Sequence, residues 1–248
     1  MNRIRTGRAL ALAALALAAH AGTARAQQLP PAQQIVDRYV QAIGGRPAFA
    51  RLASRHMVAE MSMSGMSMQM ETFTARPNKM VAVVSVNGMQ ITSGYDGQVA
   101  WTNSPMTGPR LMEGAELKQV LDNAQFDRSF DPSASSTSMT TVGERTVDGR
   151  ACWDVKIVST NGIESTNCFD KETGLLVATR AKQVSQMGEM EVDSKVLDYK
   201  DFDGVKIPTR IVSSMMGQEV VMTVKSVSHA AIPAAKFELP AEIKALQR

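Results

Sequence analysis

The stretch "HMVAEMSMSGMSMQMETF", residues 56–73, contains six methionines among eighteen residues. At its centre, Ser64-Gly65 is a turn dipeptide between two runs in which methionine recurs at every second position. This alternation predicts two antiparallel strands joined by a tight turn, with one methionine-rich face and one mostly polar face. The partners expected across the turn are Met63 with Met66, Met61 with Met68, and Ala59 with Met70.

The same alternation continues between further turn dipeptides. Around Asn87-Gly88, the face that follows the methionines carries Met80, Val84, Met89 and Ile91. Asn-Gly and Asp-Gly pairs recur later in the chain, and they favour tight hairpin turns because both central residues need positive φ. We expect a mainly β fold: an antiparallel sheet of about ten strands that curls into an unclosed β-barrel, since twisted open sheets of this size seldom stay flat.

Two segments change from strand to helix periodicity. Apolar residues at helical spacing predict an N-terminal helix over residues 35–43, which Gly44-Gly45 would end. A second, central helix is predicted over residues 114–124, with Leu117 and Leu121 on its apolar face. Lying between two halves of a curled sheet, this short helix is expected to act as a lid over the open side.

The first 26 residues have the features of a secretory signal peptide. Three arginines precede an apolar run from Ala9 to Ala19, and Ala24-Arg25-Ala26 supplies a small-x-small cleavage site. The apolar run is too short for a spanning helix, which needs roughly 20 residues. We expect residues 27–248 to form a single domain in the periplasm, without an integral membrane segment once the signal is removed.

The formal charge of +3 comes from the signal peptide. Four of the 27 basic residues lie in residues 1–26 and none of the 24 acidic residues does, which leaves 23 basic against 24 acidic residues. A balance of −1 gives no support to binding of nucleic acid or of an anionic membrane surface.

Cys152 and Cys168 are the only cysteines in the sequence. An oxidising compartment favours a disulfide between them. However, a two-residue turn at Asn161-Gly162 would leave Cys152 on the opposite face from Cys168, so the bond would need a bulge or a longer turn. A catalytic redox pair is disfavoured because the spacing is not C-x-x-C.

Three interpretations of the methionine-rich face remain open. It could be ordinary core, or a surface for an apolar ligand, since flexible thioether chains adapt to different shapes. It could also be a Cu(I) site, because soft thioethers select Cu(I), with His56 nearby as a further donor. Against copper, a metal needs three or four ligands at one point, whereas a pleated face spreads its side chains.

Catalytic signatures are lacking in the sequence. His56 and His229 lie far apart, and no nucleophile elbow, zinc-protease helix or glycine-rich phosphate loop occurs. We therefore expect a protein that is not an enzyme, with no catalytic residues, no metal and no cofactor.

Four stretches carry a family resemblance: "YVQAIGGRPAF" (39–49), "YDGQVAWTNSPMTGP" (95–109), "FDKETGLLV" (169–177) and "DYKDFDGVKIPTRI" (198–211). In their order and spacing they resemble the outer-membrane lipoprotein-sorting (LolA-like) proteins of bacteria. The resemblance implies an unclosed antiparallel barrel with a helical lid over a hydrophobic cavity, and handling of lipids or lipid-modified proteins in the periplasm.

The resulting hypothesis is a periplasmic carrier that holds a lipid, a lipoprotein acyl chain or a similar apolar ligand. A cell-envelope protein is a possible partner, and the alternative is a non-enzymatic interaction module with a filled core. The residues expected to line the cavity are Met61, Met63, Met66, Met68, Met70, Met80, Val84, Met89, Ile91, Leu117 and Leu121.

Overall fold

The computed structural model describes residues 28–185, 188–215 and 217–247. The predicted signal peptide, residues 1–26, lies outside these described ranges. The strands are β1 (Ser54–Met63), β2 (Met66–Ala75), β3 (Lys79–Val86), β4 (Met89–Tyr95), β5 (Ala100–Ser104), β6 (Gly108–Leu111), β7 (Ser136–Val147), β8 (Arg150–Ser159), β9 (Glu164–Asp170), β10 (Leu176–Ser185), β11 (Gly188–Phe202), β12 (Val205–Met215) and β13 (Gln218–Ser228). The α-helices are α1 (Ala32–Ala42), α2 (Arg46–Ala50), α3 (Gly114–Ala124) and α4 (Ala241–Ala245), and three 3-10 helices span Asp127–Ser129, Pro132–Ser135 and Ala234–Phe237.

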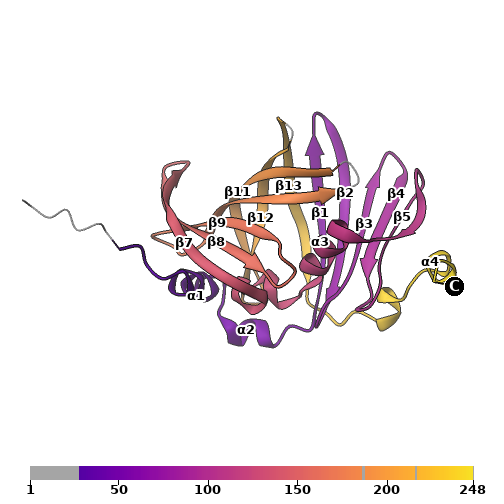
Figure 1. Ribbon diagram of the computed structural model, residues 1–248, viewed down its shortest axis with the longest axis horizontal. Coiled ribbons are helices and arrows are strands. Elements are labelled where there is room, and N and C mark those ends of the chain that lie inside the picture. Colours follow the sequence, from indigo (N-terminus) through magenta and orange to yellow (C-terminus); the bar gives the residue numbers. More distant parts are fainter. Residues whose placement is uncertain (1–27, 186–187, 216, 248) are drawn as a thin grey trace, which may run out of the picture.

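The strands form one antiparallel sheet with the order β6-β5-β4-β3-β2-β1-β13-β12-β11-β10-β9-β8-β7. The chain meanders from β1 to β6, crosses to the far edge at β7, and meanders back until β13 pairs with β1. Figure 1 shows the sheet curling so that α3 lies between its two halves. This confirms the predicted curled, unclosed antiparallel sheet, with thirteen strands in place of about ten.

Tight turns account for the hairpins. At four of them both central residues have positive φ, as two-residue hairpin turns require. These turns are Ser64-Gly65, Asn87-Gly88, Asp148-Gly149 and Asp203-Gly204. Each lets the next strand return beside the previous one, so local sequence sets most of the strand pairing.

One face of the sheet carries the main core under the N-terminal helices. Val36 and Val40 of α1 and Phe49 of α2 pack in one cluster with Ile157 of β8 and Phe169 of β9, and all five are buried. The helix α1 ends as predicted at Gly44-Gly45. Gly44 has a φ of 129°, and a Cβ there would lie 2.3 Å from the carbonyl oxygen of Gly204 in the β11–β12 turn. Only glycine allows this close packing.

The central helix α3 has the predicted bounds and covers another part of the same face. Its Leu117, Val120 and Leu121 pack against Met80 of β3 and Tyr95 of β4. The helix also contacts β10, on the other half of the sheet. It therefore bridges the two halves, as Figure 1 shows, in the position expected for the lid.

The opposite face of β2–β5 is covered by the C-terminal segment. Phe237 and Ile243 pack in one cluster with Val81 and Trp101, and all four are buried. Among the described residues, no helix is long and apolar enough to cross a membrane.

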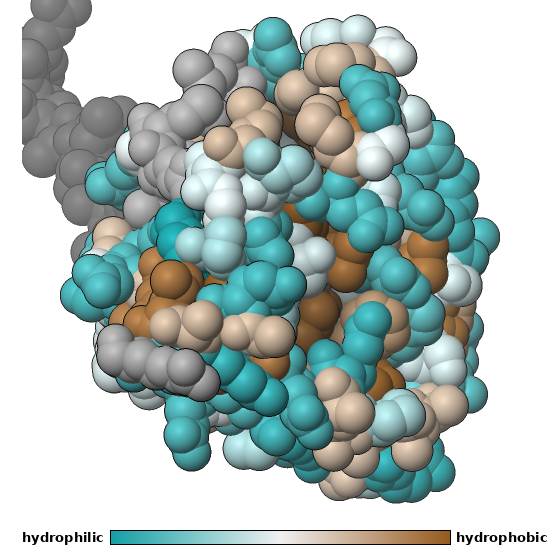
Figure 2. Space-filling model, turned by 90° about the vertical axis from the view of Figure 1, so that its right-hand side faces the viewer, coloured by the Kyte–Doolittle hydropathy of each residue, from teal (hydrophilic) through white to brown (hydrophobic). Residues whose placement is uncertain are grey.

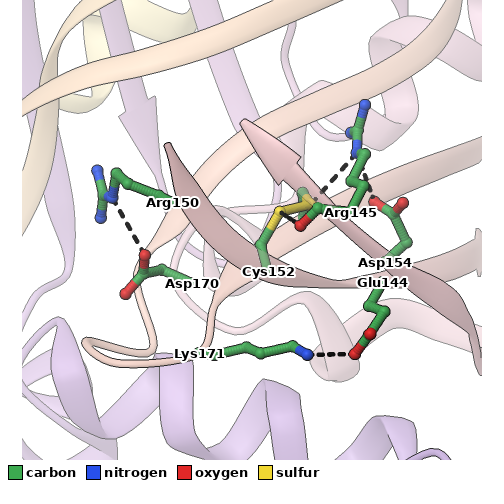
Figure 3. The surroundings of a disulfide bond; sticks show 8 residues. Glu144, Arg145, Arg150, Cys152, Asp154, Asp170 and Lys171 are labelled. Carbon is green, nitrogen blue, oxygen red and sulfur yellow. Dashed lines mark hydrogen bonds and ion pairs between the residues drawn. A yellow bond between two sulfur atoms is a disulfide. The ribbon is translucent and has the colours of Figure 1, made fainter. Parts of the chain in front are cut away.

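The structure contains a disulfide between Cys152 and Cys168, whose Cα atoms are 5.5 Å apart. Figure 3 shows ion pairs around it: Arg145 Nε lies 3.0 Å from Asp154 Oδ1, and Arg150 Nε lies 3.1 Å from Asp170 Oδ2. The register expected from a two-residue turn at Asn161-Gly162 is wrong. Val158 pairs with Glu164, which leaves a five-residue loop, and the shifted register places both cysteines on one face.

Candidate functional site

The methionine-rich face of β1–β4 is the first candidate site. Met63 pairs with Met66 and Met61 with Met68, as predicted, and Ala59 pairs with Met70. The strand pairing then carries the face sideways from Met70 to Val84 and from Val84 to Ile91. We call the "methionine face" the set of nine residues that this register places on one side of the sheet: Met61, Met63, Met66, Met68, Met70, Met80, Val84, Met89 and Ile91.

The residues of the methionine face are neither fully buried nor fully exposed. Met66 and Met89, next to the two hairpin turns, are 48% and 43% exposed, and the other seven are half-buried. By contrast, Ala59 on the same side is 0% exposed, and its cross-strand partner Val224 on β13 is also buried. Apolar surface thus reaches solvent at the turn ends of the hairpins and becomes buried toward the middle of the sheet.

The helix α3 covers one side of this face. The predicted lining residues Leu117, Leu121 and Met80 all pack against one buried cluster that contains Tyr95 and Val120. The start of the helix is tied to β6, because Arg110 donates two hydrogen bonds to Glu116, at 2.8 and 2.7 Å. Hydrogen bonding to Glu116 raises the pKa of Arg110, so the guanidinium stays charged.

The end of α3 is held by a buried ion pair that sequence reasoning missed. Arg128 Nε lies 3.1 Å from Asp122 Oδ2, and Asp122 has only 5% of its side chain exposed. A pocket of about 320 Å³ opens here between α3 and β10, and its lining includes Gln119, Asp122, Arg128 and Lys182 together with the apolar Ile163 and Ala181. Helical spacing places Asp122 on the side of the predicted helix away from Leu117, Val120 and Leu121, so no signal in the sequence marked it as buried.

A second pocket, of about 240 Å³, lies between α1 and the β8–β9 region. Ile35 and Arg38 of α1 line it on one side, with Trp153 and Asp170 on the other. It is separate from the methionine face, since its lining comes from the opposite half of the sheet.

Arg55 is a further residue that sequence reasoning missed. It lies two positions before Met57 on β1, so the alternation of side chains aims it toward the same face as the methionines. Its guanidinium carbon is 5.2 Å from the centre of the Phe130 ring. Burial lowers the pKa of Arg55 to about 10, and nearby Tyr39 opposes this change. Arg55 therefore remains a cation at neutral pH, inside an apolar region.

Of the two histidines among the described residues, His56 points away from the methionine face and His229 is bonded to an aspartate. The His56 ring stacks on Phe73, with ring centres 4.3 Å apart, and its Nε2 lies 2.7 Å from Glu71 Oε1 on the other face of the hairpin. His229 Nδ1 lies 2.9 Å from Asp203 Oδ2. The suggestion that His56 supplies a further copper ligand beside these methionines is therefore wrong. In the described part of the chain, no group of three His, Cys, Asp or Glu residues is placed to hold a metal.

Figure 2 shows the side of the molecule that lies on the right in Figure 1. Hydrophobic residues appear there in separate groups between hydrophilic ones. This surface does not form one continuous apolar patch, in contrast to the methionine face, where cross-strand neighbours are nearly all apolar.

The fold is similar to solved structures of low sequence identity. A DUF1329 family protein from Desulfovibrio piger is 14% identical, with a TM-score of 0.56 over 85% of this chain and 98% of that chain. A LolA superfamily protein from Nitrosomonas europaea is 11% identical, with a TM-score of 0.56 over 85% of this chain and 99% of that chain. A domain described as an outer membrane lipoprotein-sorting protein, from Vibrio parahaemolyticus, is 11% identical, with a TM-score of 0.51 over 86% and 100% of the two chains.

These likenesses confirm the LolA-like fold that the sequence resemblance predicted. No curated protein matches the chain. Residues 56–243, three quarters of the sequence, match the family described as a domain of unknown function, DUF4412, and the chain therefore belongs to the DUF4412 family.

Proposed function

We propose that this protein is a periplasmic carrier that holds a lipid, a lipoprotein acyl chain or a similar apolar ligand on its methionine face. One observation carries the proposal: nine apolar side chains from four adjacent strands share one side of a curled sheet, and all nine remain at least partly exposed. Monomeric soluble proteins seldom expose a contiguous apolar surface of this kind without a use for it.

The chemistry of the face suits a flexible apolar ligand. Thioether chains are unbranched and repack easily, so they adapt to an acyl chain that has no fixed shape. Each ligand methylene removed from water contributes about 0.8 kcal/mol. A handful of methylenes therefore gives micromolar binding after the cost of immobilisation, with no cofactor and no catalytic group.

The location and partners follow from the predicted signal peptide and from the fold. Export of residues 27–248 as a single domain would place the carrier in the periplasm, where lipids and acylated proteins cross between membranes. One of the solved relatives is described as a lipoprotein-sorting protein, which supports cargo of this class. A carrier also needs a donor or acceptor, and we propose that this partner is a cell-envelope protein.

The first test is native mass spectrometry of protein purified from the periplasm of its own cells. A carrier is expected to retain a lipid-sized mass. A clean apo mass, together with no binding of a fluorescent fatty acid, would instead favour an interaction module with a filled core.

The second test places charge on the proposed surface. The double variant Met63→Asp, Met68→Asp should fold but bind a fluorescent fatty acid at least about tenfold more weakly, because the charges would have to be desolvated by the ligand. Met106→Asp is the matched control, since Met106 is 81% exposed and lies outside the methionine face. Unchanged affinity in the double variant would exclude this face as the site.

A further inference from the structure

Four thioethers at the end of the β1–β2 hairpin form a compact group. Met63 lies opposite Met66 and Met61 lies opposite Met68, and both pairs point to the same side of the sheet. The end of the β1–β2 hairpin lies at the top of Figure 1, above α3. Met66 is 48% exposed, which gives a small solute access from solvent.

The register allows all four sulfurs to converge. Opposite Cβ atoms are about 5 Å apart and same-face neighbours along a strand are about 7 Å apart, so the four Cβ atoms mark a rectangle with a half-diagonal of about 4 Å. Three bonds lead from each Cβ to a metal bound at Sδ, and they span this distance. A pleated face normally keeps its side chains too far apart to share one metal ion. Methionine side chains are long enough to bridge that separation here. Met222 of β13, opposite Met61, supplies a fifth thioether next to the rectangle.

The donor set selects one class of metal. Thioethers are soft, neutral ligands that prefer Cu(I), whereas Zn²⁺ and Cu²⁺ favour nitrogen, oxygen or thiolate donors. His56 points to the other face and bonds Glu71, so its imidazole does not join the thioethers as a ligand. We propose that Met61, Met63, Met66 and Met68 form a binding site for one Cu(I) ion, in addition to the apolar-ligand function proposed above.

A site made only of thioethers has a distinctive pH dependence. Cysteine, histidine and carboxylate ligands must lose a proton to bind a metal, so their affinity falls as pH falls. A methionine thioether carries no such proton. Cu(I) affinity is therefore expected to change less than about twofold between pH 5.5 and pH 8, in contrast to a histidine site, which would weaken strongly across the same range.

The test is an anaerobic titration of the full chain, purified after export, with Cu(I) against a chromophoric chelator. The wild-type protein should bind one equivalent, and Zn²⁺ should not compete. The quadruple variant Met61→Leu, Met63→Leu, Met66→Leu, Met68→Leu should bind Cu(I) at least about tenfold more weakly, since leucine keeps the apolar volume but removes the donor. The double variant Met89→Leu, Met106→Leu is the control, and it should bind like wild type.

Three results would overturn the proposal: a quadruple variant that binds Cu(I) as tightly as wild type, a control that loses binding equally, or an affinity that falls steeply with pH. The quadruple variant also separates this proposal from the carrier function. Because leucine is as apolar as methionine, fluorescent fatty-acid binding should survive in it, and circular dichroism with a thermal melt verifies the fold. Loss of copper with retained lipid binding assigns the thioethers to the metal.

Discussion

The same side of the sheet contains two regions that differ sharply in cover. In the region under α1 and α2, Val155, Ile157 and Phe169 are at most 1% exposed and pack against helix side chains. At the end of the β1–β2 hairpin, Met66 and Met68 obey the same strand alternation but stay partly exposed. Strand periodicity is therefore common to both regions, and the position of the helices distinguishes them.

The side chains of the two regions also differ, in keeping with how far the helices cover each region. Branched and aromatic residues under the helices fix one packing arrangement, as the tilted rings of Tyr39 and Phe169 show, with centres 5.2 Å apart. Unbranched methionines beyond the helices leave the packing adaptable. The region under the helices therefore stabilises the fold, and the methionine face keeps the adaptable apolar surface on which the proposed binding rests.

Truncation should show the largest difference between the regions. Phe169→Ala is expected to lower the free energy of unfolding by about 3–5 kcal/mol, because it leaves a cavity in a closed core. Met68→Ala should cost clearly less, because its site is partly exposed and water can fill the space. Denaturant unfolding of both variants measures the two values, and equal losses would show that the methionine face is closed core as well.

Removal of the disulfide should have the next largest effect. Cys152 and Cys168 are separated by 16 residues, and a crosslink over a loop of that size contributes about 3 kcal/mol. The double variant Cys152→Ala, Cys168→Ala should lose that stability yet bind fatty acid normally, since the bond reinforces the region under the helices. Chemical unfolding with and without reductant checks the first expectation, and weakened binding in the folded double variant would link the two regions.

Low pH should destabilise the region under the helices by protonating Asp170. Burial alone would raise the pKa of Asp170, but hydrogen bonds from the Thr173 backbone and hydroxyl and from Arg150 together hold this pKa below its ordinary value. A lowered pKa in the folded protein means that the stabilisation is complete above the ordinary carboxyl pKa of about 3.9 and is lost as pH falls below it.

Asp170→Asn should therefore lower the free energy of unfolding by about 2 kcal/mol at pH 7 and flatten its decline below pH 4. Unfolding measured from pH 2 to pH 7 tests both expectations. Asp201→Asn serves as the control because Asp201 is exposed, and a profile for Asp170→Asn parallel to wild type would mean that this carboxylate does not carry the acid sensitivity.

The smallest effect is expected from Met61→Leu, a volume-conserving change on the methionine face. It should alter the free energy of unfolding by less than about 1.5 kcal/mol, because a partly open surface accommodates the new shape. Thermal melts of this variant beside Ile157→Met, a comparable exchange in the closed core, sharpen the comparison. A larger loss for Met61→Leu would reverse the assignment of the two regions.

Much of the sheet could be predicted from local sequence. Ser64-Gly65 and Asn87-Gly88 fix their hairpins because two positive φ values in succession permit only a tight turn. Met61 lies opposite Met68 because of the Ser64-Gly65 turn, and both point to the same side of the sheet because strand side chains alternate with a period of two. The bounds of α3 were predictable for the same kind of reason, since the helical spacing of apolar residues is local.

Other features depend on contacts between distant segments. The Cys152–Cys168 pairing depended on a five-residue loop that the Asn161-Gly162 dipeptide alone did not indicate. After β6 the chain crosses to the far edge of the sheet at β7, and β13 then pairs with β1. Both features bring together segments that are remote in sequence.

Local sequence is enough to establish which residues of β1–β4 share a face, because the pleat of a strand and the length of a turn are local properties. The part of that face that the helices cover depends on tertiary contacts, because α1, α2 and α3 are placed by packing against strands far away in the chain. The cover in turn separates the closed core around Phe169 from the accessible thioethers at Met61–Met68.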